Sequence, residues 1–212
     1  MNIKDFGAFV FQINLVNGFS ILDNRGKIFS EILNFGDQKI LENNDTVRVS
    51  DERGEYQVSA ISFLVKLRVD KINALITEGK EDQVVSYINS SLEDFINKSK
   101  AICALLKVKK VSRFACRFIA NYTNASESDV KSIFSIEKKA LERDFKNITR
   151  GINANELIFS AIYDKTKLTL DIDKYINTNQ FDIDEIEEKY DIILKQFRDN
   201  ILSPRTMVNN LI

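Results

Sequence analysis

The chain has 212 residues, of which 44% are hydrophobic, and its 30 Lys and Arg residues balance 31 Asp and Glu residues to a formal net charge of -1. This length and composition predict one domain with an ordinary core, and the balanced charge gives no overall field toward nucleic acid or an anionic membrane. The chain has no histidine, which excludes Ser-His-Asp and Cys-His catalysis and histidine-ligated metals. We therefore expect a single domain over residues 1–212, no metal, no cofactor and no nucleic-acid partner.

The two cysteines, Cys103 and Cys116, lie in apolar neighbourhoods, as buried thiols usually do. The first residues do not read as a secretory signal, so we expect a cytoplasmic protein without a disulfide between these cysteines. The longest apolar runs are far shorter than the roughly 20 residues that a membrane-spanning helix needs. We expect no membrane association.

The first third of the chain has the alternation of β-strands. Large apolar residues occupy every second position from Phe9 to Leu15, and the positions between them hold valine, glutamine and asparagine. This alternation predicts a strand with one face more buried than the other. The short runs Phe19 to Leu22 and Ile28 to Leu33 are predicted to be further strands, because the string Asp-Asn-Arg-Gly at 23–26 between them is typical of a turn.

A hairpin is predicted next, with Thr46 to Ser50 as its first arm and residues 51–54 as its turn. Gly54 can adopt the left-handed conformation that such a turn needs. The second arm is predicted to run from Glu55 onward as one long strand, and its alternation is clearest from Ile61 to Val69. We expect residues 1–80 to form the β-rich part of the domain.

Residues 81–212 are predicted to mix helices and strands. Apolar residues follow a helical stripe from about Asp82 to Leu106, and a strand is predicted from Val111 to Tyr122. A second helix begins at Ser126, its N-cap, with Asp129 three residues on, and extends to Phe145.

The end of the chain predicts a hairpin and a closing helix. The hairpin pairs Leu157 to Tyr163 with Leu168 to Tyr175. The helix begins at Asp182, with Glu185 completing a capping box, and ends before Pro204.

These elements predict an α+β fold, in which a curved antiparallel sheet is covered by three amphipathic helices. Core packing is the expected role of the phenylalanines that fall on inward faces: Phe9, Phe11, Phe63, Phe95, Phe118, Phe134 and Phe197. A helix-grip-like arrangement would also allow an aromatic-lined cavity between the sheet and the terminal helix.

Two strands of the second half carry a resemblance to a known family. Val111 to Tyr122 reads VSRFACRFIANY and resembles the strand pattern v-x-R-i-g-x-R-y-i-N of a sporadically distributed, largely uncharacterised family of prokaryotic proteins. Leu168 to Tyr175 reads LTLDIDKY and resembles the pattern l-x-l-D-i-D-x-y of the same family. The resemblance implies this order of strands and the closing helix at Phe181 to Leu202, and it implies no activity.

The same two strands supply the candidate binding residues. Arg113 and Arg117 project from one face of the first strand, and Asp171 and Asp173 share a face of the second. If the strands are neighbours, these residues are expected to form cross-strand ion pairs. The alternative is a polar site, in which the arginines hold an anion or the carboxylates hold a divalent cation.

Asp70, Glu78 and Lys80 have the outline of a metal-dependent nuclease motif, in which two carboxylates would hold Mg²⁺ and the lysine would assist a water molecule. Glycine stands at position 79, where that motif has an apolar strand residue. A polar connection before the next helix explains these residues equally well.

We expect no catalytic residues, and we predict a non-catalytic binding or regulatory protein that acts through a protein partner, with a homodimer as one form of this prediction. Two alternatives stay open. One is a small-ligand binder with a cavity between the sheet and the helices, and the other is a metal-dependent nuclease.

Overall fold

A computed structural model of the chain describes residues 2–16, 19–33, 41–43, 46–134, 148–150, 157–164 and 166–198. Its strands are β1 (Asn2–Leu15), β2 (Leu41–Asn43), β3 (Thr46–Ser50), β4 (Gly54–Ser59), β5 (Ser62–Leu67), β6 (Lys110–Thr123), β7 (Ile148–Arg150), β8 (Leu157–Asp164) and β9 (Lys167–Asp182). Its helices are α1 (Phe19–Lys27), the π-helical turn η1 (Ile28–Ile32), α2 (Val69–Thr77), α3 (Glu81–Leu106), α4 (Glu127–Phe134), the 3₁₀ turn η2 (Ile183–Glu185) and α6 (Ile186–Arg198).

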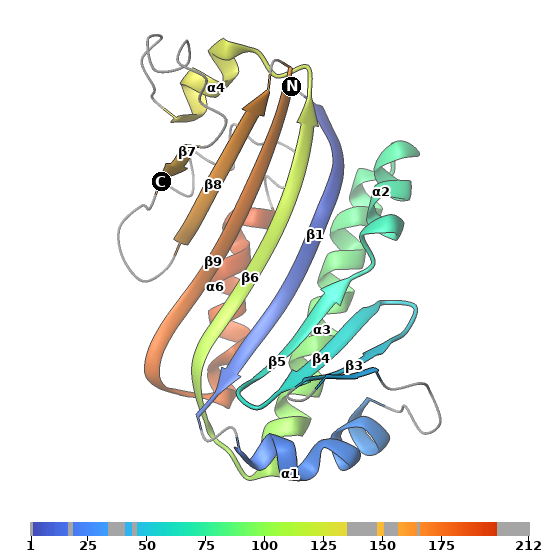
Figure 1. Ribbon diagram of the computed structural model, residues 1–212, viewed down its shortest axis with the longest axis vertical. Coiled ribbons are helices and arrows are strands. Elements are labelled where there is room, and N and C mark those ends of the chain that lie inside the picture. The colour runs from blue at the N-terminus through green and yellow to red at the C-terminus, as the bar shows by residue number, and fades with distance from the viewer. Residues whose placement is uncertain are drawn as a thin grey trace.

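The strands form one antiparallel sheet of nine strands among the described residues, in the order β2-β3-β4-β5-β1-β6-β9-β8-β7. The long strands β1, β6 and β9 curve together, and the helices α3 and α6 lie behind the sheet in the view of Figure 1. The helix α3 contacts β1 and β5, while α6 contacts β6 and β9. The α+β fold with a curved antiparallel sheet is therefore confirmed.

The core lies between the sheet and these two helices. The ring centroid of Phe11 of β1 lies 5.8 Å from that of Phe95 of α3 and 6.0 Å from that of Tyr190 of α6. The Tyr190 hydroxyl also lies 2.6 Å from the carbonyl oxygen of Gln12 and 3.1 Å from that of Ala115, so it ties α6 to the two central strands. Alternate residues of β6 and β9 are buried in the same core: Phe114, Cys116, Phe118, Leu168, Leu170 and Ile172.

The predicted strands between Phe19 and Leu33 are wrong. This segment forms α1 and η1, and Ile21, Ile28 and Phe29 are buried in the core. These positions are separated by seven and eight residues, which is two turns of an α-helix, and so they fall on one helical face.

The predicted second arm of the first hairpin is also wrong as one continuous strand. A turn at Ser59–Ser62 divides it into β4 and β5, and Val69 begins the helix α2. Gly54 does not adopt a left-handed conformation; its backbone lies so close to β5 that a Cβ atom there would overlap the carbonyl oxygen of Lys66. Phe63, Val65 and Leu67 are buried, as this alternation predicted, whereas Ile61 lies in the turn and is exposed.

Both predicted helix caps are confirmed. Ser126 Oγ accepts a hydrogen bond from the Asp129 backbone N–H at 3.1 Å, and the Asp129 carboxylate accepts one from Ser126 N–H at 2.9 Å. Asp182 and Glu185 form the capping box that starts η2 and α6. The helix beyond Phe134, the side chains of Phe134 and Phe197, and the end before Pro204 lie outside the described residues.

Cys103 and Cys116 are both free, buried thiols. No helix in the described part of the chain is both long and apolar enough to cross a membrane.

Candidate functional site

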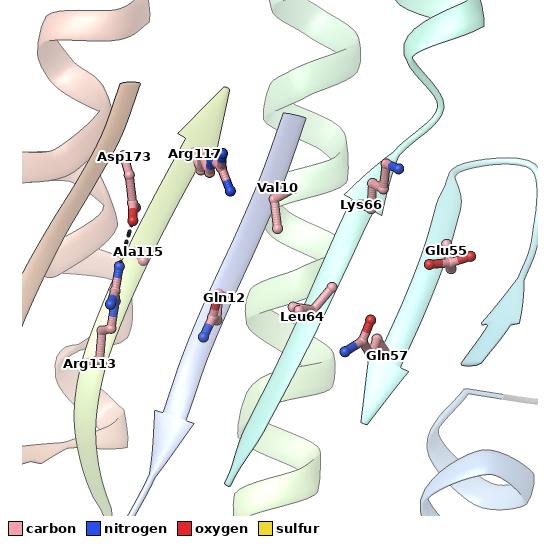
Figure 2. Close-up of a pocket in the computed structure, with 10 residues that line it drawn as sticks. All are labelled: Val10, Gln12, Glu55, Gln57, Leu64, Lys66, Arg113, Ala115, Arg117 and Asp173. Atoms are coloured by element: carbon pink, nitrogen blue, oxygen red, sulfur yellow. Dashed lines mark hydrogen bonds and ion pairs between the residues drawn. The ribbon is translucent and has the colours of Figure 1, made fainter. Parts of the chain in front are cut away.

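A groove of about 380 Å³ crosses the face of the sheet that points away from α3 and α6 (Figure 2). Side chains of five adjacent strands line it: Glu55 and Gln57 of β4, Leu64 and Lys66 of β5, Val10 and Gln12 of β1, Arg113, Ala115 and Arg117 of β6, and Asp173 of β9. Successive side chains of a strand point to opposite faces. The alternation that buries Phe9 and Phe11 therefore turns Val10 and Gln12 into the groove.

Strand register places five of these residues in one row across the sheet. Glu55 pairs with Lys66, which pairs with Val10, which pairs with Arg117, which pairs with Asp173. Adjacent strands are about 4.8 Å apart, so the row spans roughly 19 Å. The two outer residues of the row are acidic and the next two inward are basic. The apolar Val10 lies at its centre.

The four predicted binding residues come together in two ion pairs, and the predicted pairing of their strands is confirmed. Arg117 donates from Nε and Nη2 to the two carboxylate oxygens of Asp171 at 2.9 and 2.7 Å, and these hydrogen bonds raise the pKa of Arg117 above its usual value. Arg113 Nη2 donates to Asp173 at 2.8 Å. The Arg113 guanidinium also lies 4.3 Å from the centre of the Tyr175 ring, a cation–π contact.

The other polar residues of the groove have unused hydrogen-bonding groups. Lys66 and Glu55 form neither an ion pair nor a side-chain hydrogen bond with any residue that the structure describes, although they face each other on adjacent strands. Gln12 donates to Asn14 at 2.7 Å through its amide nitrogen, which leaves its amide oxygen for a ligand. Short side chains at Val10 and Ala115 keep the centre of the groove hollow.

The nuclease-like motif is not brought together. Asp70 lies in the first turn of α2, so its predicted place in a loop is wrong, while Glu78 follows the end of that nine-residue helix. The rise of an α-helix separates their backbones by roughly 12 Å. Each carboxylate has its own cation, Arg68 for Asp70 at 2.8 Å and Lys80 for Glu78 at 2.6 Å. The hydrogen bond from Arg68 lowers the pKa of Asp70.

Aromatic rings fill the region where a cavity between sheet and terminal helix was predicted. Phe95 lies 5.4 Å from Phe63 and 5.6 Å from Tyr190, and Phe114 lies 5.9 Å from Tyr190, again between ring centroids. Contacts at these distances are typical of a packed core.

A second hollow, of about 470 Å³, lies where α3 ends beside η2. Cys103 and Asp182 are among its lining residues. Burial, with a smaller contribution from Asp182, raises the pKa of the Cys103 thiol to about 12. A thiol that stays protonated is a weak nucleophile, so this hollow does not have the chemistry of a cysteine active site.

No family model, no curated protein and no solved structure matches the chain. The resemblance of β6 and β9 to the sporadically distributed prokaryotic family therefore stays a prediction. The sequence identified Arg113, Arg117 and Asp173 of the groove, but it missed Lys66, Glu55 and the two glutamines. Their positions on outward faces were visible in the alternation of single strands, whereas the pairing of β5 with β1 was not.

Proposed function

We propose that the protein is a non-catalytic binding protein, whose groove holds an extended segment of a protein partner. The observation that carries this proposal is the shape of the groove, which crosses five strands over roughly 19 Å. An extended chain advances about 3.3 Å per residue, so the groove has room for about six residues.

The side chains of the groove suit a peptide. Gln12 and Gln57 carry amides, which both donate and accept hydrogen bonds, as a peptide backbone requires. A small ligand is less well served, because its sites usually enclose 70–90% of its surface, and this groove opens to one side of the sheet. A nuclease is less well supported still, because Asp70 and Glu78 lie at opposite ends of α2.

We place this activity in the cytoplasm, because free buried thiols such as Cys103 and Cys116 are usual in a reducing compartment. Charge opposes a homodimer in which two grooves meet at Val10. A two-fold axis along β1 would set Lys66 of one copy against Arg117 of the other, and an axis along the row would set each of these cations against itself. Like charges face each other in both arrangements.

A pull-down with two matched tryptophan variants tests the proposal. The tagged protein is immobilised and exposed to a lysate of the organism that encodes it. Val10→Trp fills the centre of the groove, and Asn97→Trp adds the same bulk to an exposed position of α3. We expect the wild type and Asn97→Trp to retain the same protein, and Val10→Trp to lose it with an unchanged circular dichroism spectrum. Equal retention by both variants would contradict the proposal.

A further inference from the structure

The row of paired residues in the groove has a symmetric order of charges. Lys66 and Arg117 lie on the strands that flank β1, and both pair with Val10. One cation therefore lies on each side of this apolar residue (Figure 2). Glu55 and Asp173 lie one strand further out. The centre of the row is therefore positive, and both of its ends carry acids.

Both central cations have donors to offer. Lys66 is exposed and has no partner among the described residues, so its flexible side chain can turn toward a ligand without breaking an ion pair. Arg117 has five N–H donors and gives Nε and one Nη2 hydrogen to Asp171, so its Nη1 group remains. An oxyanion above Val10 can approach both.

The two acidic ends differ. Asp173 already accepts a hydrogen bond from Arg113, whereas Glu55 has no ion pair within the described residues. Glu55 lies two strands from Val10, which is about 9.6 Å, or three residues of an extended chain. A cation three positions from the oxyanion would therefore reach Glu55.

We propose that the groove selects partner segments that carry an acidic residue and, three positions before or after it, a basic residue. The acidic residue lies above Val10, between Lys66 and Arg117. The basic residue contacts Glu55. This inference rests on the proposed function, because it specifies which segment the groove holds. It commits to a carboxylate side chain of a protein as the central ligand.

Peptide libraries test the inference without knowledge of the partner. Three mixtures of heptapeptides have random residues at all but the two ends and the centre: Lys-x-x-Glu-x-x-Lys, Lys-x-x-Gln-x-x-Lys and Glu-x-x-Lys-x-x-Glu. The fixed residues are symmetric, so the direction of the bound chain does not matter. Each mixture is passed over the immobilised full chain, and the retained peptide is quantified.

We expect the wild type to retain the Glu-centred mixture on the order of fivefold more than the Gln-centred one, which is the size of effect that exposed ion pairs produce. Non-specific attraction to a chain of net charge -1 would give the opposite order, because the Gln-centred mixture is more positive. Lys66→Gln and Arg117→Gln should each remove most of the preference. Lys110→Gln, which changes an exposed lysine outside the groove, should keep it.

Glu55→Gln tests the outer contact. A fourth mixture, Ser-x-x-Glu-x-x-Ser, is compared with Lys-x-x-Glu-x-x-Lys. The wild type should retain less of the Ser-ended mixture than of the Lys-ended one, whereas Glu55→Gln should retain the two mixtures in equal amounts. Lys66→Gln changes an exposed side chain that has no partner among the described residues, so we expect this variant to fold as the wild type does.

The possible results separate this inference from the proposed function. Equal retention of all mixtures by the wild type, together with its loss in Val10→Trp, would overturn the charge preference while the groove remained the binding site. A preference for the Lys-centred mixture would also overturn it. Retention of no mixture, or retention that Val10→Trp leaves unchanged, would overturn both.

Discussion

Phe118 is a residue at which the cost of a hole in the core can be measured. Its side chain is fully buried, and its ring lies 5.9 Å from that of Phe9 and 6.1 Å from that of Phe6. We expect Phe118→Ala to lower the free energy of unfolding by about 3–5 kcal/mol, because it removes the ring contacts and leaves a cavity. Urea unfolding measures the change. Ile162→Ala, at an exposed residue, should cost less than about 1 kcal/mol, and similar costs at both sites would contradict the description of the core.

The Arg117–Asp171 pair is open to solvent, with side chains 51% and 28% exposed. We therefore expect Arg117→Ala and Asp171→Ala each to cost about 1 kcal/mol or less, with a coupling energy no larger than that. A double-mutant cycle in urea gives the coupling. If the single variants keep full stability and no coupling is found, yet the Arg117 variant loses the Glu-centred peptides, the arginine serves binding alone and the structural role of the pair is wrong.

The sequence was informative about single residues and silent about which of them meet. Alternation correctly turned Arg113 and Arg117 outward and Phe118 inward, because that period follows from the geometry of one strand. The row through Lys66 and Val10 depends on the register between β5 and β1, and these two residues are 56 positions apart in the sequence. Such pairing is decided by packing of the whole sheet, so no local pattern could reveal the groove.

Glycine gives opposite predictions in two elements. In β4, a Cβ atom at Gly54 would overlap the backbone of β5, whereas one at Gly26 of α1 would meet no atom within 4 Å. We expect Gly54→Ala to lower the free energy of unfolding by about 1–3 kcal/mol. We expect Gly26→Ala to raise it by about 0.5–1 kcal/mol, because alanine favours a helix. Thermal melts of both variants would contradict this account if the two changes had the same sign.

The elements that were predicted wrongly from the sequence are short, and the residues in or beside them are typical of another kind of structure. The string at 23–26 has the composition of a turn, but it lies inside α1, whose stability comes from burying Ile21 against the rest of the core. Val69 continues the alternation of the preceding strand and yet begins α2. In both places tertiary packing overrides local preference, while α3 and the hairpin of β8 and β9 were long or regular enough to be predicted.

At the scale of the whole molecule, β1 joins the two parts of the chain. It pairs with β5 from the β-rich part and with β6 from the mixed part, so residues 1–80 and 81–212 contribute to one sheet. The helices α3 and α6 cover one face of that sheet, over a core in which aromatic rings contact one another. The polar and charged residues of the groove lie on the other face. This face is therefore the one that we expect to bind a partner.

The buried thiols and phenols predict that the molecule loses stability in alkaline solution. Burial raises the pKa of Cys103 from near 9 to about 12, and it also raises the pKa of Cys116 and Tyr190. The unfolded chain releases these protons at lower pH than the folded chain, so their contribution is complete below pH 9 and is lost as pH rises toward 12. Each group contributes a slope of up to about 1.4 kcal/mol per pH unit in that window.

Urea unfolding between pH 7 and 11 measures this loss, and Cys103→Ala isolates one group. The variant should be less stable than the wild type at pH 7, because it removes a buried sulfur atom. Between pH 9.5 and 11 the free energy of unfolding should fall less steeply with pH in the variant than in the wild type. The two slopes should differ by about 1 kcal/mol per pH unit. Lysine deprotonation affects both proteins equally and cancels in the difference. Parallel curves for the two proteins would show that the Cys103 thiol titrates alike in the folded and unfolded chain, which would contradict its burial beside Asp182.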